Sequence, residues 1–299
     1  MWVDVAVCTY KRLSIRETLD SISAQILPSD VTLRVLVVEN DDQPNMRPTI
    51  LDHANALGLN LRYVHAPGSN ISIARNACLE NSGSGILLFI DDDEVADHDW
   101  VKNILESWRR SSASVVFGSA IAVYPPDVPA WLKGNDFHSN IPIPNKGIVE
   151  TGFSSNVLLD RSDERVRGAR FDLKFGRTGG EDVDFFFRLH RDNVPMAIAN
   201  DAIVREPVLP NRTSFRWVLR RRIMTGSIYG TCAASGDTLK RAHLFMTSTV
   251  KAAYCGLRSF VAAPYQAKRV FWIMRGSFHA GVAFGCISRI RREVYGSNA

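Results

Sequence analysis

Four consecutive acidic residues, Asp91 to Glu94, follow directly after the apolar run Ile86–Ile90. Like charges packed together repel one another unless a cation neutralises them, and carboxylate oxygens alone select a hard ion such as Mg²⁺ or Mn²⁺. Asp91 and Asp93 are separated by one residue, a spacing that lets both carboxylates approach one metal ion, directly or through water. The alternative is a solvated turn that only caps the following helix, a role that Asp97 can also fill.

A second acidic pair, Glu181-Asp182, follows two glycines, Gly179 and Gly180. Glycines allow the backbone to turn sharply at the start of a helix and to approach a ligand closely. If residues 91–93 hold a metal ion, a separate carboxylate at Asp182 is available as a general base. The alternative is that these acidic residues only complement the dipole of the helix that they open.

Hydroxyl and guanidinium groups form a third set of candidates. Thr9, Tyr10 and Arg12 follow the first apolar run of the chain, and the segment from Ser69 to Asn76 opens a predicted helix and contains Arg75. Hydroxyls, a helix N-terminus and guanidinium groups suit a nucleotide and its phosphates. Taken singly, Arg75 is equally well explained as a surface cation and Tyr10 as a partly buried core aromatic.

Short apolar runs alternate with helical patterns over the first 125 residues. A capping box at Ser14-Ile-Arg-Glu17 opens one helix, and an apolar stripe from Trp100 to Trp108 marks another. Five strands with four helical connections predict a doubly wound α/β sheet, in which ligands bind beyond the carboxyl ends of the strands. The predicted strands are Val3–Cys8, Leu33–Glu39, Leu61–His65, Ile86–Ile90 and Ser114–Tyr124.

The second half of the chain differs from the first in composition and in predicted elements. Residues 125–146 are rich in Pro, Asn and Gly and predict a long loop, and Thr151–Leu159 and Pro195–Val204 predict two more strands. Beyond Pro210, helical segments carry Arg and Lys among large apolar residues. We therefore expect a catalytic domain at 1–209 and a basic helical extension at 210–299.

Composition bounds the class of protein. The 299 residues are 45% hydrophobic and 22% charged, which excludes a disordered or collagen-like chain. The net charge of +5 is uneven, because residues 201–299 hold 16 Lys and Arg against 4 Asp and Glu. Five cysteines without a CxxC pair predict reduced thiols and a cytoplasmic protein, and no uninterrupted apolar run reaches the ~18 residues that cross a bilayer.

The order of these motifs resembles that of the family-2 inverting glycosyltransferases of the GT-A fold, particularly bacterial enzymes of exopolysaccharide and succinoglycan assembly. The resemblance covers roughly residues 3–205, and the ordered set is far more specific than any one motif. It rests on Thr9-Tyr-Lys-Arg12, Glu39-Asn-Asp-Asp42, Asn70–Ala74 with Arg75-Asn76, Phe89-Ile-Asp-Asp-Asp93 and Gly180-Glu-Asp182.

The resemblance implies a GT-A, Rossmann-like fold with a mixed, mainly parallel sheet, helices on both faces and a C-terminal helical extension. It implies transfer of a hexose, with glucose as first choice, from a UDP-sugar donor to a hydroxyl of a lipid-linked saccharide acceptor. Asp91 and Asp93 are the implied ligands of Mn²⁺ or Mg²⁺, Asp182 is the implied catalytic base, and Glu181 is the other candidate. The residues implied to bind the nucleotide are Thr9, Tyr10, Arg12, Glu39, Asp41, Asp42, Arg75, Asp91 and Asp92.

The basic extension suggests a second partner. Phe215–Met224 and Ala267–Arg275 mix cations with Trp, Phe and Met, as helices at a membrane interface do. We expect peripheral contact with the inner face of the cell membrane, while the alternative is a helical subdomain that packs on the sheet. Nucleic acid is a weaker candidate, since basic charge alone is non-specific and no recognised motif is present.

Two other functions fit some of the same residues. Ile90–Val95 also fits the motif of a haloacid-dehalogenase-like phosphatase, with Asp91 as covalent nucleophile and Asp93 as acid/base. A non-catalytic protein that binds sugar nucleotides would keep the fold but not the reaction.

Overall fold

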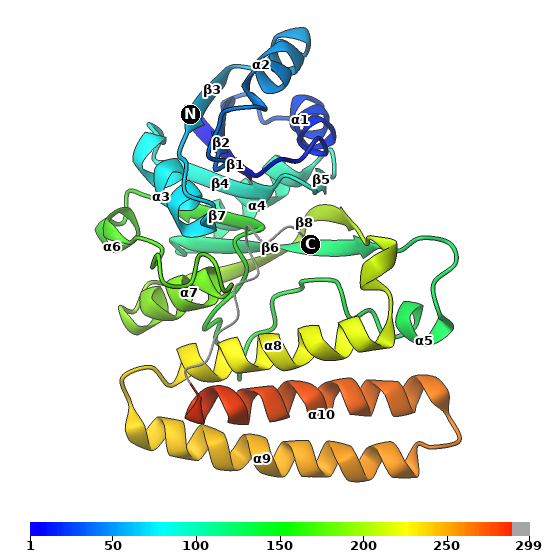
Figure 1. Ribbon diagram of the computed structural model, residues 1–299. Helices are drawn as coiled ribbons and strands as arrows, with labels where there is room; N and C mark the ends of the chain where they lie inside the picture. The colour runs from blue at the N-terminus through cyan, green and yellow to red at the C-terminus, as the bar shows by residue number, and fades with distance from the viewer. Residues whose placement is uncertain (289–299) are drawn as a thin grey trace. The chain divides into compact units, whose positions relative to one another are not determined.

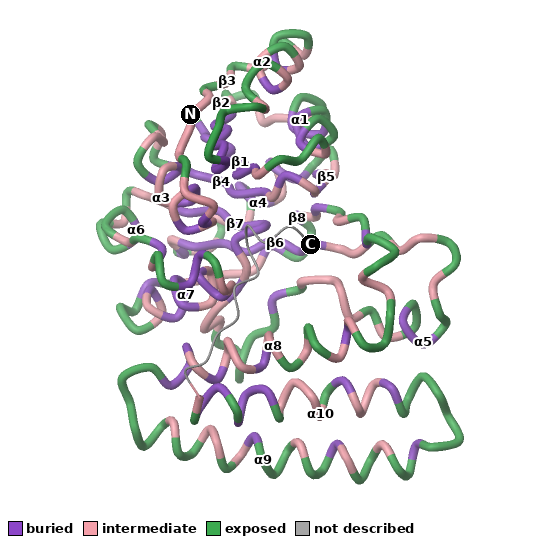
Figure 2. Tube along the Cα trace, in the orientation of Figure 1, coloured by how far each residue is buried: buried purple, intermediate pink, exposed green. Residues whose placement is uncertain are grey.

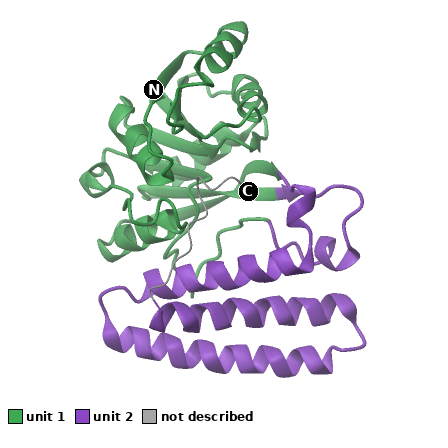
Figure 3. Cartoon of the chain, in the orientation of Figure 1, with its two compact units in different colours: residues 1–121, 139–206, 293–299 green, residues 122–138, 207–292 purple. Residues whose placement is uncertain are grey.

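The computed structural model describes residues 1–288, which form two compact units (Figure 3). Unit 1 contains residues 1–121 and 139–206, and unit 2 contains residues 122–138 and 207–288. Residues 125–146 were expected to form a long loop of the first domain, but the apolar residues of 125–138 pack with the C-terminal helices. Trp131 and Leu132 are buried in one cluster with Val218, Val270 and Met274. The functional division at residues 209 and 210 stays a prediction.

Unit 1 is built on one sheet of eight strands, in the order β3-β2-β1-β4-β7-β6-β8-β5 (Figure 1). All seven predicted strands are present, and the two-residue strand β5 was not predicted. Residues 151–155, expected to begin a strand, are outside β7. The strands are β1 (Trp2–Thr9), β2 (Thr32–Glu39), β3 (Leu61–His65), β4 (Ile86–Asp91), β5 (Val95–Ala96), β6 (Val115–Val123), β7 (Asn156–Asp160) and β8 (Met196–Pro207).

The first four strands of the sheet are parallel, and the direction changes beyond β4. β1 pairs in parallel with β2 and β4, and β2 with β3. β7 is antiparallel to both of its neighbours, β4 and β6, so β6 runs in the same direction as β4 without touching it. The sheet is therefore mixed and mainly parallel, as expected, with β7 inserted between β4 and β6.

Helices cover both faces of this sheet because successive side chains of each strand point to opposite sides. Val3, Val5 and Val7 of β1 pack with one set of helices, whereas Ala6 and Cys8 pack with another. Strands β1, β4 and β7 are accordingly buried along most of their length (Figure 2), whereas β3 and β8 are not. The helices of unit 1 are α1 (Ile15–Ser23), α2 (Arg47–Ala56), α3 (Ile71–Asn81), α4 (Trp100–Arg110), α6 (Glu164–Gly168) and α7 (Glu181–Arg191).

The two helices predicted most directly begin close to where the sequence indicates. The apolar stripe of α4 is buried, and Trp100 lies fully inside. At α1 the helix forms, but the predicted capping box does not, because the side chain of Ser14 makes no capping hydrogen bond. The backbone carbonyl of Ser14 instead accepts from Glu17 N at 2.9 Å.

Unit 2 consists of the short helices α5 (Ala130–Lys133) and η1 (Pro210–Arg212) and three long ones, α8 (Phe215–Ala233), α9 (Thr238–Val261) and α10 (Gln266–Ile287). α10 lies between α8 and α9 and packs along both (Figure 1). Among the helices that the structure describes, α10 is long and apolar enough to cross a membrane by length and composition, although it contains charged residues. Residues 289–299 of the predicted extension lie outside the described residues.

Candidate active site

The acidic turn after β4 does not present its three aspartates alike. Asp92 turns inward and is 5% exposed, accepting hydrogen bonds from Thr9 Oγ1 at 2.7 Å and from Arg12 Nη1 at 3.0 Å. Asp93 accepts from the same Arg12 nitrogen at 2.5 Å and is more exposed. Burial raises the pKa of Asp92 to about 7, although Arg12 opposes this shift. Asp92 therefore joins the turn to β1, and Asp91 and Asp93 on either side of it remain accessible.

Glu94 holds the shape of this turn from inside. Its side chain is buried and its Oε2 accepts from the backbone N–H of Asp91 at 3.0 Å. Its own carbonyl accepts from Thr18 Oγ1 of α1 at 2.8 Å. Burial, and then the neighbouring Asp91, raise the pKa of Glu94 well above its usual range. The spacing of Asp91 and Asp93 is thus maintained by contacts with β1 and α1.

Arg75 of α3 joins the acidic turn to the start of α7. Its guanidinium pairs with Glu181, and Arg75 Nη2 lies 3.5 Å from Asp91 Oδ1. The same guanidinium lies over the ring of Phe171, 5.7 Å from its centre. Burial alone would lower the pKa of Arg75, but Glu181, Asp91 and Asp182 together raise it. Arg75 is a buried cation among three carboxylates, so the alternative of a surface cation is wrong.

The glycine pair before α7 makes the predicted sharp turn. Gly179 and Gly180 have φ values of 79° and 90°, in the region that favours glycine, and Gly180 is the N-cap of α7. Glu181 is buried, burial raises its pKa to about 7 against the effect of Arg75, and its Oε2 has no hydrogen-bond partner. Asp182 is half-buried, and its Oδ1 accepts from Val183 N at 2.7 Å. The two acidic residues thus differ in accessibility.

The N-terminus of α3 is fixed by amide side chains. Asn70 caps the helix by accepting from Ser72 N at 3.0 Å, and its own N–H donates to Asn40 Oδ1 at 2.6 Å. Asn40 in turn donates to the carbonyl of Ala66 at 2.5 Å. Asn40 is buried and was not singled out from the sequence, although it lies inside the polar turn of residues 39–42. This network orients the helix that carries Arg75.

The turn after β2 separates its acidic residues. Glu39 is fully buried, and its two oxygens accept from Tyr63 OH at 2.5 Å and Met46 N at 3.0 Å, so it faces away from the other candidates. Asp41 is buried next to Lys11, whose Nζ lies 3.3 Å from Asp41 Oδ1. Asp42 is exposed. The structure thus groups Asp41 with Lys11 after β1, but not the Glu39 side chain.

The segment after β1 carries the remaining candidates. Tyr10 is half-buried, and its hydroxyl accepts from Ser69 Oγ at 3.4 Å. Lys11 Nζ lies over the Tyr10 ring, 5.1 Å from its centre. Tyr10 therefore lies between the turn after β1 and the loop before α3, at the edge of the site and outside the apolar core.

Ser155 is a further residue beside the acidic turn that the sequence did not suggest. Asn156 of β7 pairs with Ile90 of β4, so the antiparallel register brings Ser155 next to Asp91. The Ser154 and Ser155 hydroxyls are buried without a hydrogen-bond partner. Because this neighbourhood depends on β7 pairing with β4, no local motif could have revealed it.

Carboxylates near the site are balanced by guanidinium groups. In residues 1–288, no group of three or more His, Cys, Asp or Glu side chains is arranged to hold a metal ion. Asp91 and Asp93 provide two carboxylates, each paired with an arginine. The protein therefore offers two hard oxygen donors, and a bound ion would need further ligands from a substrate such as a diphosphate.

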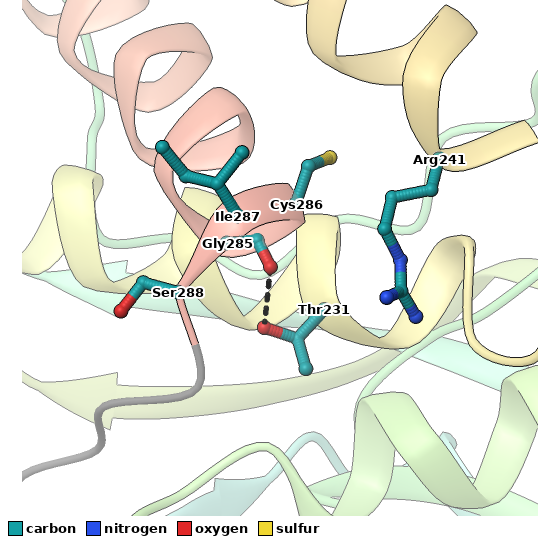
Figure 4. A pocket seen from close by; sticks show the side chains of 6 residues that line it. All are labelled: Thr231, Arg241, Gly285, Cys286, Ile287 and Ser288. Atoms are coloured by element: carbon teal, nitrogen blue, oxygen red, sulfur yellow. Dashed lines mark hydrogen bonds between the residues drawn. The ribbon is translucent and has the colours of Figure 1, made fainter. Parts of the chain in front are cut away.

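Two cavities lie away from this group. An open groove of about 850 Å³ in unit 1 is bordered by α1, β5 and α4 and is lined by acidic residues, including Asp20, Asp99 and Asp201. In unit 2, a cavity of about 60 Å³ lies at the end of α10, where Thr231 donates to the carbonyl of Gly285 (Figure 4). Neither includes a residue of the predicted site, and the second is too small for a sugar.

Comparison with known proteins agrees with this geometry. The family model for glycosyl transferase family 2 matches residues 4–164. Succinoglycan biosynthesis protein ExoM of Rhizobium meliloti (strain 1021) is 38% identical over 296 residues, which are 99% of this chain and 96% of that protein.

Solved structures share the GT-A fold. The mannosyltransferase PcManGT from Pyrobaculum calidifontis, in complex with GDP-Man and Mn²⁺, has a TM-score of 0.61 at 19% identity, covering 96% of this chain and 88% of that one. S. aureus TarS 1–349, in complex with UDP-GlcNAc, has a TM-score of 0.56 at 15% identity, covering 94% and 92%. The family assignment replaces the phosphatase and the non-catalytic alternatives. The chain is a glycosyltransferase and belongs to glycosyl transferase family 2.

Proposed function

We propose that this enzyme transfers a hexose, with glucose as first choice, from a UDP-sugar to a hydroxyl of a lipid-linked saccharide during synthesis of a bacterial surface polysaccharide. The observation that carries the proposal is the convergence of three elements around Arg75. This residue of α3 pairs with Asp91 after β4 and with Glu181 at the start of α7. The residues that we propose for the donor site and for the general base are thereby linked within one unit.

A divalent cation fits the residues present. Asp91 and Asp93 are hard oxygen donors one residue apart, and Glu94 and Asp92 fix the turn that holds them. We propose that they bind Mn²⁺ or Mg²⁺ together with the diphosphate of the donor, with Asp93 as the direct ligand. Such an ion supplies electrostatic stabilisation of the charge that develops on the leaving diphosphate.

The cations of the site suit the diphosphate itself. Arg12 is paired with Asp92 and Asp93, and Arg75 with Asp91 and Glu181. If Asp91 and Asp93 held a metal ion, Arg12 and Arg75 would keep Asp92 and Glu181 as partners, and the N–H groups released from Asp93 and Asp91 would be available to phosphate oxygens. Thr9, Tyr10, Asp41 and Asp42 border the same side of the sheet and are our candidates for contacts with the uridine.

Asp182 is the better candidate for the base. Glu181 is buried and forms an ion pair with Arg75, whereas Asp182 is half-buried and accessible to an acceptor. We propose that Asp182 removes the proton from the acceptor hydroxyl as its oxygen attacks the anomeric carbon. The new carbon–oxygen bond forms on the face opposite to the breaking sugar–phosphate bond, so the anomeric configuration is inverted and UDP leaves.

Similar proteins support the proposed type of donor and the proposed pathway. One relative is a succinoglycan biosynthesis protein, and neighbours of the same fold bind UDP-GlcNAc or GDP-Man with Mn²⁺. From the first we propose exopolysaccharide synthesis, and hence a lipid-linked acceptor at the cytoplasmic face of the membrane. Unit 2 is the part of the chain for which we propose membrane contact.

The test separates donor binding from transfer. Calorimetry with a panel of UDP-hexoses, with and without Mn²⁺, is expected to give one donor whose affinity increases with the metal ion. Asp182→Asn is expected to bind that donor within about twofold of the wild type and to lose transfer by about 10²–10⁴-fold. Asp184→Asn is the control, because Asp184 lies on the same helix but pairs with Arg188 at 2.8 Å.

Unchanged transfer by Asp182→Asn would remove Asp182 from the mechanism. If saturating Mn²⁺ left the affinity for every UDP-hexose unchanged, the proposed role of the cation in donor binding would be wrong. Equal losses in Asp182→Asn and Asp184→Asn would show that the defect is one of folding, and circular dichroism of both variants distinguishes that outcome.

A further inference from the structure

The outward face of α9 in unit 2 is a continuous apolar stripe. Leu239, Met246, Val250, Leu257 and Val261 follow one another at separations of seven, four, seven and four residues, which keeps them on one line along the helix. Their exposed fractions run from 67% to 84%. Phe260 beside them is 80% exposed, and Figure 2 shows that most of α9 is exposed or half-buried. We call these five residues the α9 stripe.

The face of α9 that packs on α10 has the opposite character. Its buried residues are Ser248 and Cys255, and a Cβ placed on Gly276 of α10 would lie 3.1 Å from the Cys255 Cβ. In water-soluble proteins a surface helix turns its large apolar residues inward and its polar ones outward. α9 reverses this pattern, with small residues at the helix contact and large apolar ones outside, as helices surrounded by lipid do.

The contact between α8 and α10 is of the same kind. Two glycines on each helix, four residues apart, allow the backbones to touch, because a Cβ at any of them would overlap a carbonyl oxygen of the other helix. Small residues at this spacing are typical of helices that associate in membranes. The four positions are Gly226, Gly230, Gly281 and Gly285.

Cations flank the α9 stripe on one side. Lys240, Lys251 and Arg258 are eleven and seven residues apart, about three and two helical turns, so they also form a line. Neither α9 nor α10 contains an acidic residue. The Arg258 guanidinium lies 4.9 Å from the ring centre of Trp272. An apolar stripe bordered by cations and aromatic rings is complementary to the acyl and phosphate layers of an anionic bilayer.

We propose that α9 lies in the plane of an anionic membrane surface, with the α9 stripe in the acyl boundary and Lys240, Lys251 and Arg258 at the lipid phosphates. This assigns the membrane contact proposed for unit 2 to one helix, and it rests on the proposed function because that function includes the membrane contact. It also moves the contact away from the two stretches that the sequence suggested. Val270 and Met274 of the second stretch are buried inside unit 2, and Trp217 of the first stacks on His138.

A second copy of the chain is a poorer occupant of this face. Two α9 stripes facing each other would bring together cations from both copies, with no carboxylate on α9 or α10 to neutralise them. Among the described residues of unit 2, 13 Lys and Arg stand against 3 Asp. Repulsion of this size opposes self-association and favours a negatively charged surface.

The test is flotation of the full-length protein with two kinds of vesicle, phosphatidylcholine alone and an equal mixture with phosphatidylglycerol. The wild type is expected to float with the anionic vesicles. Val250→Asp and Leu257→Asp are each expected to lower the partition coefficient at least tenfold, and Lys251→Gln about fivefold. The controls are Ile143→Asp, which changes another residue that is 83% exposed, and Lys102→Gln; both are expected to float like the wild type.

Each result that differs from this expectation has its own interpretation. Flotation that is equal for wild type, Val250→Asp and Leu257→Asp would overturn the α9 assignment while leaving membrane contact intact. No flotation of the wild type, combined with a lipid-free dimer in sedimentation that Val250→Asp converts to a monomer, would identify a second copy as the occupant. Donor binding by calorimetry is unaffected in either case, so failure here is separate from failure of the proposed transfer reaction.

Discussion

Arg75 and Glu181 form an ion pair in which both side chains are buried, with 7% and 8% of their surfaces exposed, although 106 positions separate them in the chain. The pair joins α3 to the first turn of α7 next to Asp91. Removing two charges from water is costly, and the cost is recovered only while both partners are present. This pair therefore couples the two elements that carry the proposed donor and base residues.

Arg75→Met is expected to lower the free energy of unfolding by about 3–5 kcal/mol, because it leaves Glu181 buried without a partner. Arg75→Met/Glu181→Gln is expected to regain at least about 1 kcal/mol of this loss, since the neutral amide is easier to bury. Urea denaturation of the wild type, Glu181→Gln, Arg75→Met and the double variant measures the coupling. Strictly additive losses would contradict the pairing.

Asp92 is expected to make stability depend on pH. A carboxyl group with a raised pKa holds its proton more tightly in the folded protein, so its contribution to stability is complete below its unfolded pKa, about 4. That contribution is lost as pH rises through the folded pKa of about 7. Because Asn cannot titrate, the free energy of unfolding of the wild type is expected to fall by on the order of 4 kcal/mol relative to that of Asp92→Asn between about pH 4 and pH 8. Parallel dependences of the free energy of unfolding on pH for the two proteins would contradict the raised pKa of Asp92.

Transfer is expected to require a divalent cation. Dialysis against a chelator is expected to abolish transfer. Addition of Mn²⁺ or Mg²⁺ is expected to restore transfer, because Asp91 and Asp93 can hold the added ion beside the leaving diphosphate. Asp91→Asn and Asp93→Asn are each expected to lower transfer about a hundredfold or more and to raise the Mn²⁺ concentration needed. Asp52→Asn on the exposed side of α2 is the control. Full activity in the chelated wild type would refute the metal role.

Gly176 is expected to tolerate no side chain. Its carbonyl accepts from Ile71 N at 3.1 Å, and a Cβ there would overlap the Asn70 side chain that caps α3. Gly176→Ala is expected to displace this cap and lower the free energy of unfolding by about 1–3 kcal/mol, with weaker donor binding because α3 carries Arg75. Thermal denaturation and calorimetry measure the two effects. Gly168→Ala is the control, since Gly168, like Gly176, has no positive φ but has open space around it.

Several parts of the fold follow from local sequence alone. The apolar run before Asp91 predicts β4, the stripe of Trp100 to Trp108 predicts α4, and Gly179-Gly180 predicts the sharp turn before α7. Each depends on residues within one turn or one strand of each other, where backbone preference and side-chain period decide the outcome. The acidic turn is predicted at the same range, and its metal-binding role stays a prediction.

Other parts depend on which segments meet. That β7 inserts between β4 and β6, and so brings Ser155 beside Asp91, is decided by strand pairing over about 65 residues. The inward turn of Asp92 toward Thr9 and the withdrawal of Glu39 toward Tyr63 are likewise contacts between separate elements. Neighbouring aspartates look alike in the sequence and differ only in what the fold packs against them.

The amino-acid sequence by itself determined seven of the eight strands, the helices α1 and α4, the acidic turn and the family of this protein, because these follow from short-range spacing and from an ordered set of motifs. Only the tertiary structure decided which carboxylates are buried with arginines, that residues 122–138 pack with the C-terminal helices, and that α9 carries its large apolar residues outward. The reason is that burial is a property of contacts between distant segments. The same type of residue is buried in one tertiary environment and exposed in another, and no local sequence pattern distinguishes the two.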